Sequence, residues 1–469
     1  MFEIEGKYNK AKIFANEVDN ETISQIMDLC NQKWLEGCNI AIQADTHAGK
    51  GCTIGTTITL KDKVSPSLVG VDISCGMLVI QIPKELKLNL EKIDNFINDN
   101  IPAGFEVNEI LQYNEIELNL LLTSLHCYEN LKNVSRIKKA CGTLGGGNHF
   151  IEINKSEDGN HYLVIHSGSR NLGKQVAEIY QDIADEHCNK NEETKKTLRK
   201  TLIEDLKKQG RNSEIQKELE RFDETYKETK KIPHDLCCLE GKDMQNYLED
   251  THVCNEYAKM SRVSIAQRIL EFIVEDNFLD TPEQKEDLNV WIDETQENHF
   301  EFGYENRFID VRSDGFQTLH NYIGKDNILR KGAISAHKNE KVIIPINMRD
   351  GSIIAIGKGN AEYNYSGPHG AGRLMSRSEA KDNVDLQEFK GSMRDVYSSS
   401  VGISTLDEAP VVYKPIESII NNYVEIYNES CIVNSHISES VWLDKAYISS
   451  SQIKGNRKIQ NINLHKYYS

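Results

Sequence analysis

Five residues that lie far apart in the sequence carry side chains that divalent metal ions prefer in proteins. Asp72 and Cys75 lie three residues apart in VGVDISCGM, between an apolar run and a glycine. A carboxylate and a thiol are both costly to bury without compensation. A divalent cation compensates both, because it binds deprotonated oxygen and sulfur. The plainer interpretation is a buried free cysteine beside a turn-forming aspartate. The other three residues are histidines, His149, His166 and His320.

Each histidine stands in a glycine-rich loop or near the end of an expected strand. In CGTLGGGNHFIEI, four glycines precede Asn148 and His149, and the alternating apolar residues that follow are typical of a strand. In YLVIHSGSRNLGK, His166 ends an apolar strand and Arg170 stands at a helix start, which favours anions. Any one of these histidines could instead be structural. Together, one carboxylate, one thiolate and three imidazoles suit one or two borderline divalent ions such as Mn, Zn or Co.

A second group of residues could handle phosphate. Gly357–Ala380 places five glycines around His369, which could be a further metal ligand or a sterically accessible nucleophile. Arg373 follows four residues later, on the same face if a helix begins near Gly370. Two metals with an arginine clamp are the general arrangement for phosphoryl or nucleotidyl transfer, so hydrolase and transferase both remain open. The cationic candidates are Arg170, Lys331, Arg373 and Arg377.

A mixture of helices and strands is expected to position these residues. Glu21–Trp34 has apolar residues at helical spacing, whereas Asn39–Leu60 is strand-like, with Asp45 and His47 in a loop that a plain turn would also explain. Residues 84–140 are mostly polar and helical in pattern. Residues 187–231 are rich in Lys and Glu and predict a solvated helical arm, and the helical pattern resumes over Gln245–Leu270. Residues 276–305 are acidic and expected at the surface.

The composition excludes several classes of protein. The 469 residues are 39% hydrophobic and 27% charged, which is ordinary for a globular protein. Neither a signal peptide nor a membrane span is visible, and eleven scattered cysteines favour a reducing compartment, so a cytoplasmic protein without a membrane partner is expected. The net charge of −17 argues against broad attraction to nucleic acid and leaves room only for a local basic site.

Nine motifs, spread over about residues 39–415, resemble the RtcB family of RNA ligases. They are GVDISCGM, DTHAGKGCTIG, GTLGGGNHFIEI, VIHSGSRNLG, LHNYIG, RKGA, GKGN, HGAGRLMSRSEAK and LDEAP. The resemblance implies an α/β fold: a single large catalytic domain over 1–415 with a central metal cleft and a charged helical insertion at about 187–270. Residues 416–469 would form a C-terminal extension.

The resemblance also implies a reaction. A histidine attacks the α-phosphate of GTP, and the resulting histidine–GMP passes its guanylyl group to an RNA 3′-phosphate before a 5′-hydroxyl seals the strand. A 2′,3′-cyclic phosphate end is opened first. Here His369 matches the nucleophile. The positions that match the ligands of two Mn ions are Asp72, Cys75, His149, His166 and His320. The positions that match nucleotide contacts are Asn148, Glu152, Gly370 and Gly372, and those that match basic groups are Arg170, Lys331 and Arg373.

Three departures separate the chain from the commoner family form. PINMRDGS at 345–352 replaces a glycine-rich segment that helps hold the nucleotide, Lys454–Gly455 only superficially resembles the usual C-terminus, and the arm at 187–231 is an addition. The departures suggest RNA repair rather than a commitment to tRNA splicing. Two alternatives remain: a metal-dependent RNA end-processing phosphodiesterase that has lost ligation, and a non-catalytic RNA-binding factor.

Overall fold

A four-stranded antiparallel sheet carries most of the candidate ligands at one end of its strands. In the computed structural model, which describes residues 1–82, 86–156, 158–189, 195–225, 232–278, 289–293, 299–304, 307–309, 315–416 and 426–433, its strand order is β13-β6-β8-β7. These strands are Gly315–Leu319 (β13), Gly76–Ile82 (β6), His161–Ser167 (β8) and Phe150–Lys155 (β7). The strand expected after His149 is therefore present as β7, and the strand expected to end at His166 is present as β8.

Both faces of this sheet are buried, because successive side chains of a strand point to opposite faces and β6, β7 and β8 carry buried residues at nearly every position. On one face, residues such as Leu78, Ile151 and Ile165 pack against α3 (Leu90–Asn100) and the second half of α9 (Gly241–Phe278). On the other face, Val79 and Val164 pack against β17 (Lys341–Asn347) and β18 (Gly351–Gly357). His166 has the parity of Val164 and therefore points between the two sheets.

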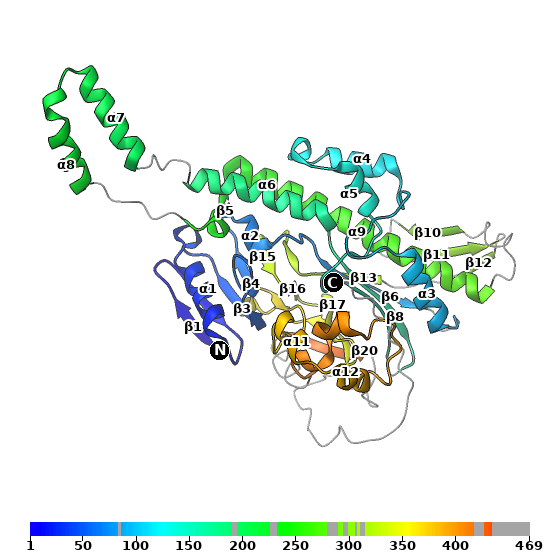
Figure 1. Cartoon of the computed structure of the whole chain (residues 1–469). Helices are drawn as coiled ribbons and strands as arrows, with labels where there is room; N and C mark the ends of the chain where they lie inside the picture. Colours follow the sequence, from blue (N-terminus) through cyan, green and yellow to red (C-terminus); the bar gives the residue numbers. More distant parts are fainter. Residues whose placement is uncertain are drawn as a thin grey trace.

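A six-stranded sheet lies beside the first, with the order β1-β2-β3-β4-β15-β14 (Figure 1). Its core is shared with α1 (Asn20–Cys30), α6 (Arg170–Asn189) and the first half of α9. Helix α1 ends at Cys30, before the predicted end at Trp34. The backbone becomes extended at Gln32 and then forms a separate 3-10 turn. The strands are Phe2–Glu5, Lys10–Ile13, Ile40–His47, Ile54–Thr59, Ile328–Lys331 and Asn321–Ile323.

The remaining elements are short. The helices are α2 (Pro66–Val69), α4 (Glu115–Thr123), α5 (Val134–Ala140), α11 (Arg377–Asn383) and α12 (Leu386–Ser392). The strands are β5 (Lys63–Val64), β9 (Leu239–Glu240), β10 (Asn289–Asp293), β11 (His299–Tyr304), β12 (Arg307–Ile309), β16 (Ala333–Ser335), β19 (Ser366–Pro368) and β20 (Tyr427–Val433). Strand β20 pairs with β18, so this part of the predicted C-terminal extension belongs to a sheet of the body. Lys454–Gly455 lies outside the described residues.

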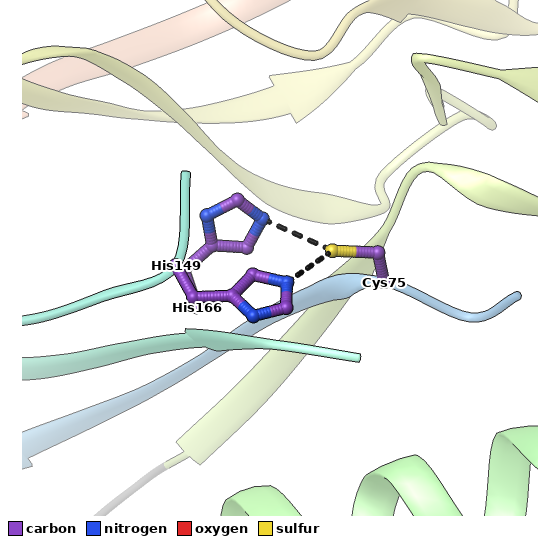
Figure 2. A group of neighbouring side chains, drawn as sticks. All are labelled: Cys75, His149 and His166. Atoms are coloured by element: carbon purple, nitrogen blue, oxygen red, sulfur yellow. Dashed lines mark hydrogen bonds between the residues drawn. The ribbon is translucent and has the colours of Figure 1, made fainter. Parts of the chain in front are cut away.

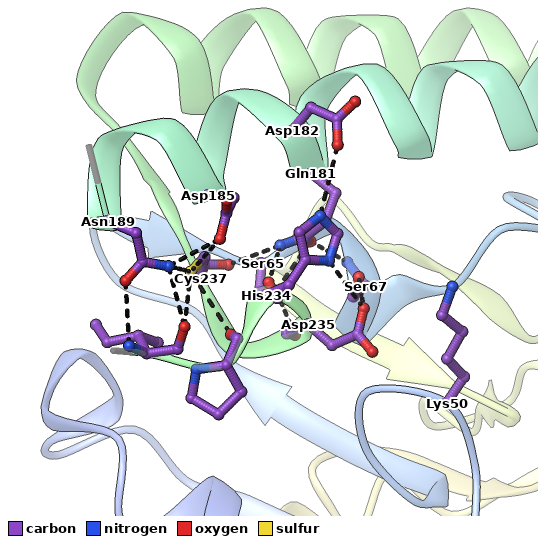
Figure 3. A network of polar contacts seen from close by, with 12 residues as sticks. Lys50, Ser65, Ser67, Gln181, Asp182, Asp185, Asn189, His234, Asp235 and Cys237 are labelled. Atoms are coloured by element: carbon purple, nitrogen blue, oxygen red, sulfur yellow. Dashed lines mark hydrogen bonds and ion pairs between the residues drawn. The ribbon is translucent and has the colours of Figure 1, made fainter. Parts of the chain in front are cut away.

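The charged arm is helical, as predicted. Helices α7 (Lys195–Lys208) and α8 (Ile215–Thr225) project away from the body (Figure 1). The chain that returns from the arm is fastened to the body by a polar network (Figure 3). In it, Gln181 of α6 donates to the carbonyl of His234, and Ser67 donates to Asp235 at 3.0 Å. No helix among the described residues is both long and apolar enough to cross a membrane.

Candidate metal centre and active site

Strand order explains why ligands from four distant motifs meet. Cys75 directly precedes β6, His149 directly precedes β7, and His320 directly follows β13. Neighbouring strands are antiparallel, so the starts of β6 and β7 lie at the same edge as the ends of β8 and β13. The register confirms this, because His166 near the end of β8 is opposite Met77 and Phe150.

The ligand atoms lie within hydrogen-bonding distance of one another. The Cys75 Sγ is 3.3 Å from the Nε2 of His149 and 3.3 Å from that of His166 (Figure 2). The Nε2 atoms of His166 and His320 are 3.4 Å apart, and Asp72 Oδ2 is 3.0 Å from His149 Nε2. Cys75 and the three histidines are all buried. The structure therefore brings all five predicted metal ligands together.

The hydrogen bond of His166 favours a cation in this cluster. His166 Nδ1 lies 2.9 Å from the Asn148 carbonyl. A carbonyl can only accept, so this Nδ1 carries the proton and the neutral ring presents its Nε2 lone pair to the cluster. His149 Nε2 lies 3.0 Å from the Asp72 carboxylate, which can accept a hydrogen bond from it. A divalent ion could bind the His166 lone pair together with the neighbouring sulfur and oxygen atoms.

Burial controls the charges of these groups. It raises the pKa of the Cys75 thiol well above its usual value, and the nearby Asp72 charge raises it further. It lowers the pKa of His166 and of His320 well below the usual value, and neighbouring imidazoles add to this effect. Burial alone would raise the pKa of Asp72, but the hydrogen bond and charge of His149 hold it below its usual range. Metal binding must therefore displace the thiol proton.

The metal-free protein is expected to lose stability below about pH 6.5. His166 and His320 have folded-state pKa values below the unfolded value, so only the unfolded chain takes up protons as the pH falls through this range. Each histidine should lower the free energy of unfolding by about 1 kcal/mol between pH 6.5 and 5.5. Melting temperatures of chelator-treated protein would show this decrease. A double variant, His166→Gln with His320→Gln, should show a smaller decrease, and an equal one would contradict the explanation.

His369 lies next to this cluster and is held by a carboxylate. Its Nδ1 is 2.8 Å from Asp45 Oδ2, and the same oxygen accepts from the His369 backbone N–H at 3.1 Å. Its ring centroid is 5.0 Å from that of His320. Because Nδ1 donates to Asp45, the Nε2 lone pair remains available for attack. Sequence reasoning gave Asp45 no role, although its DTH motif was among those that resembled the family.

A cavity opens onto His369, His166 and His320. The predicted nucleotide contacts Asn148, Glu152, Gly370 and Gly372 all line it, together with His47 and Tyr413. The Glu152 carboxylate is 1% exposed and accepts from the Ser352 hydroxyl at 3.1 Å. The segment that departs from the family pattern forms part of the wall, through Pro345, Ile346, Asn347 and Gly351.

Arg373 and Arg377 of the HGAGRLMSRSEAK motif also line this cavity, and the helix in this motif begins after Gly370. Helix α11 begins at Arg377, where a capping box formed by Ser376 and Glu379 fixes its start. Arg373 therefore precedes the helix. Its Nη2 donates to the Asp407 carbonyl at 2.6 Å, and Arg377 forms an ion pair with the Asp407 carboxylate at 2.6 Å. The LDEAP motif thus positions both guanidinium groups at the cavity wall.

Lys331 and Arg170 are placed differently. Lys331 is 4% exposed, lines a separate cavity that also reaches Asp72, and donates to the carbonyls of Lys50 and Ser67. Lys331 is therefore not among the residues that line the cavity with His369. Arg170 Nη1 donates to the Leu144 carbonyl at 2.8 Å and lies 2.7 Å from His149 Nδ1, beside the metal cluster.

Comparison with known proteins identifies the family of the chain. The family described as tRNA-splicing ligase RtcB matches residues 25–435. The chain belongs to the RtcB family. Similar RtcB proteins include an RNA-splicing ligase RtcB from Escherichia coli, 26% identical over 81% of this chain and 85% of the relative. A tRNA-splicing ligase RtcB from Aeropyrum pernix is 24% identical over 87% and 90%. One from Nanoarchaeum equitans is 24% identical over 81% and 83%.

The RtcB match confirms the family prediction and the expectation of a ligase that acts on RNA. The predicted α/β fold is also confirmed, and the cluster of Cys75, His149 and His166 supports the predicted metal cleft. The match begins at residue 25 and ends at residue 435.

Proposed function

We propose that the protein is a GTP- and Mn-dependent RNA ligase. It would join RNA 3′-phosphate or 2′,3′-cyclic phosphate ends to 5′-hydroxyl ends through a covalent intermediate in which GMP is attached to His369. The observation that carries the proposal is the pairing of His369 Nδ1 with Asp45 at 2.8 Å. A buried carboxylate that holds one ring nitrogen fixes the tautomer and leaves the other nitrogen as a nucleophile.

The reaction is proposed in three transfers. His369 Nε2 forms a bond to the α-phosphorus of GTP as the bond to pyrophosphate breaks. An oxygen of the RNA 3′-phosphate then attacks the same phosphorus, which frees the imidazole and leaves GMP on the RNA end. Finally the 5′-hydroxyl attacks the 3′-phosphorus and GMP leaves. Asp45 compensates the positive charge that the imidazole carries while it is bonded to phosphorus.

The metal would be held by the five clustered ligands, which are Asp72, Cys75, His149, His166 and His320. Bound there, Mn would neutralise phosphate charge and lower the pKa of a hydroxyl or water at the reacting end. Arg373 lines the same cavity and would bind phosphate oxygens.

The nucleotide would occupy the cavity beside His369. Asn148 would contact a phosphate, and the Glu152 carboxylate would accept from the N–H groups of guanine. The buried position of Glu152 supports this role, since Asn154 and Ser352 both donate to its Oε1 and hold the carboxylate in place at the cavity wall. The altered wall at Pro345–Asn347 is where preference among nucleotides would differ from that of relatives.

Labelling with each nucleotide in turn tests this function. The protein is incubated with Mn and α-labelled GTP, ATP, CTP or UTP, and the covalent label is measured after denaturation. We expect label from GTP, and joining of RNA strands that carry a 3′-phosphate and a 5′-hydroxyl. Opening of a cyclic phosphate without label or joined product would instead establish the end-processing phosphodiesterase. RNA binding without any metal by elemental analysis would establish a non-catalytic factor.

The Asp45→Asn variant is expected to reduce the rate of covalent labelling by about 100- to 1,000-fold. The amide keeps the size of the side chain but cannot compensate the imidazolium charge, and it can impose the wrong tautomer on His369. Single-turnover labelling over a range of pH measures the effect. Unchanged metal content would show that the loss arises at the nucleophile, and a rate equal to that of wild type would contradict the role of Asp45.

A further inference from the structure

A basic cavity next to the metal centre has no role in the reaction described above. It measures about 400 Å³ and lies between the turn at 104–107, the start of α5 and the start of α6. Its lining carries four cations and one carboxylate: Lys132, Arg136, Arg170, Lys174 and Glu106. In a chain with a net charge of −17, this local excess of positive charge provides what a phosphate backbone requires.

Phe105 stands at the rim of this cavity with its ring in solvent. It is 91% exposed, more than any other large hydrophobic residue among those the structure describes. Leaving such a ring in water forgoes the stabilisation that its burial would give. The Arg136 guanidinium donates to the Phe105 carbonyl, so a cation of the cavity holds the turn that presents the ring. Exposed aromatic rings beside cations are the usual platform on which single-stranded bases stack.

The turn that presents Phe105 is joined to the metal site by backbone hydrogen bonds. Gly104 N–H donates to the Gly145 carbonyl at 3.0 Å, and Leu144 N–H donates to the Pro102 carbonyl at 2.9 Å. The carbonyl of Leu144 in turn lies 3.0 Å from His149 Nδ1. The backbone of the turn that carries Phe105 is therefore tied to the loop that carries a candidate metal ligand.

Arg170 connects the cavity with the metal centre. It lines the cavity, and its Nη1 lies 2.7 Å from His149 Nδ1. Its guanidinium passes over Gly145, where a Cβ would lie only 1.4 Å from Nη2. The cavity thus lies next to His149, a candidate ligand of the metal cluster.

We propose that this cavity and Phe105 form the groove for the single-stranded RNA next to the end being joined. Bases stack on Phe105, and phosphates face Lys132 and Lys174. The proposal rests on the proposed ligase function, because it takes the reacting end to be at the metal centre. It assigns RNA binding to a local basic groove within an acidic protein.

Two variants of the full-length protein test the groove by fluorescence anisotropy with a labelled single-stranded RNA. Phe105→Ala should weaken binding about 10-fold, as expected for loss of one stacked base, and Phe105→Trp should restore it. The double variant Lys132→Ala with Lys174→Ala should also weaken binding. In that variant the slope of log affinity against log salt should become shallower by about 1.4, which is the contribution of two phosphate contacts to a single strand.

Matched controls separate this proposal from the proposed function. Ile116→Ala on α4 removes another exposed apolar side chain, and Lys207→Ala with Lys208→Ala on α7 removes two charges outside the groove; both should bind RNA like wild type. Wild-type affinity and an unchanged salt slope in both groove variants would overturn the groove, even if the enzyme labels and ligates. Absence of covalent labelling in the wild-type protein would overturn the proposed ligase function. The anisotropy measurement would still test the proposed RNA groove.

Discussion

Replacing His369 with alanine is expected to abolish covalent attachment of GMP to the protein. No other imidazole of the cluster can substitute, because His149, His166 and His320 direct their Nε2 atoms at one another and at Cys75. Labelling by α-labelled GTP with Mn should fall below detection, which corresponds to a loss of at least about 10,000-fold. The label on the wild-type protein should be lost in acid and persist in base, as a phosphorus–nitrogen bond requires.

A matched control for this variant is His337→Ala. That imidazole is partly exposed and bonds to Asp326 at 2.9 Å, away from the cavity, so labelling should be retained. Joining of an RNA that already carries a 3′-guanylylated end tests the same assignment independently. His369→Ala should seal this activated end, because the nucleophile has no further part once GMP is on the RNA. Covalent labelling of the His369→Ala protein would contradict the assignment of His369 as the nucleophile.

The second large effect is expected at Cys75. Cys75→Ala removes the only sulfur of the cluster and the atom to which both His149 and His166 point at 3.3 Å. Loss of an outer contact to a metal ligand commonly costs 10- to 100-fold in affinity, so loss of a direct ligand should cost more than about 100-fold. Elemental analysis and chelator competition measure metal content, and labelling and ligation should both be lost.

Cys254→Ala provides the matched control for Cys75. Cys254 is also fully buried, and burial likewise raises the pKa of its thiol well above the usual value, but it lies in the core shared with α9. Its replacement should leave the metal content unchanged. Equal metal content in Cys75→Ala and wild-type protein would show that the cluster is held for another reason, such as packing.

Much of the fold and of the metal site could be predicted from the sequence. Alternating apolar residues predicted β7 correctly and a short apolar run predicted β8, because both patterns are local properties of the sequence. Glycine-rich loops and strand ends likewise marked His149, His166 and His320. Their joint occurrence with Asp72 and Cys75 was sufficient to predict the metal cluster and the RtcB family, which the structure and the comparisons support.

Local patterns did not predict the positions that depend on distant packing. The start of α11 was set by the Ser376 cap and not by the glycines before it, so Arg373 stands outside the helix. Lys331 looked like a phosphate ligand in sequence. In the structure its ammonium group is held by two backbone carbonyls in another cavity.

By itself, the sequence determined the donor types and the local geometry of each motif. Tertiary structure alone decided which motifs meet. Asp45 and His369 are 324 residues apart, and they pair because β3 and the residue after β19 come together in the packed core. The same holds for Phe105, whose turn is joined to the glycine loop by backbone hydrogen bonds. Such pairings follow from strand register and packing, and no spacing within one segment encodes them.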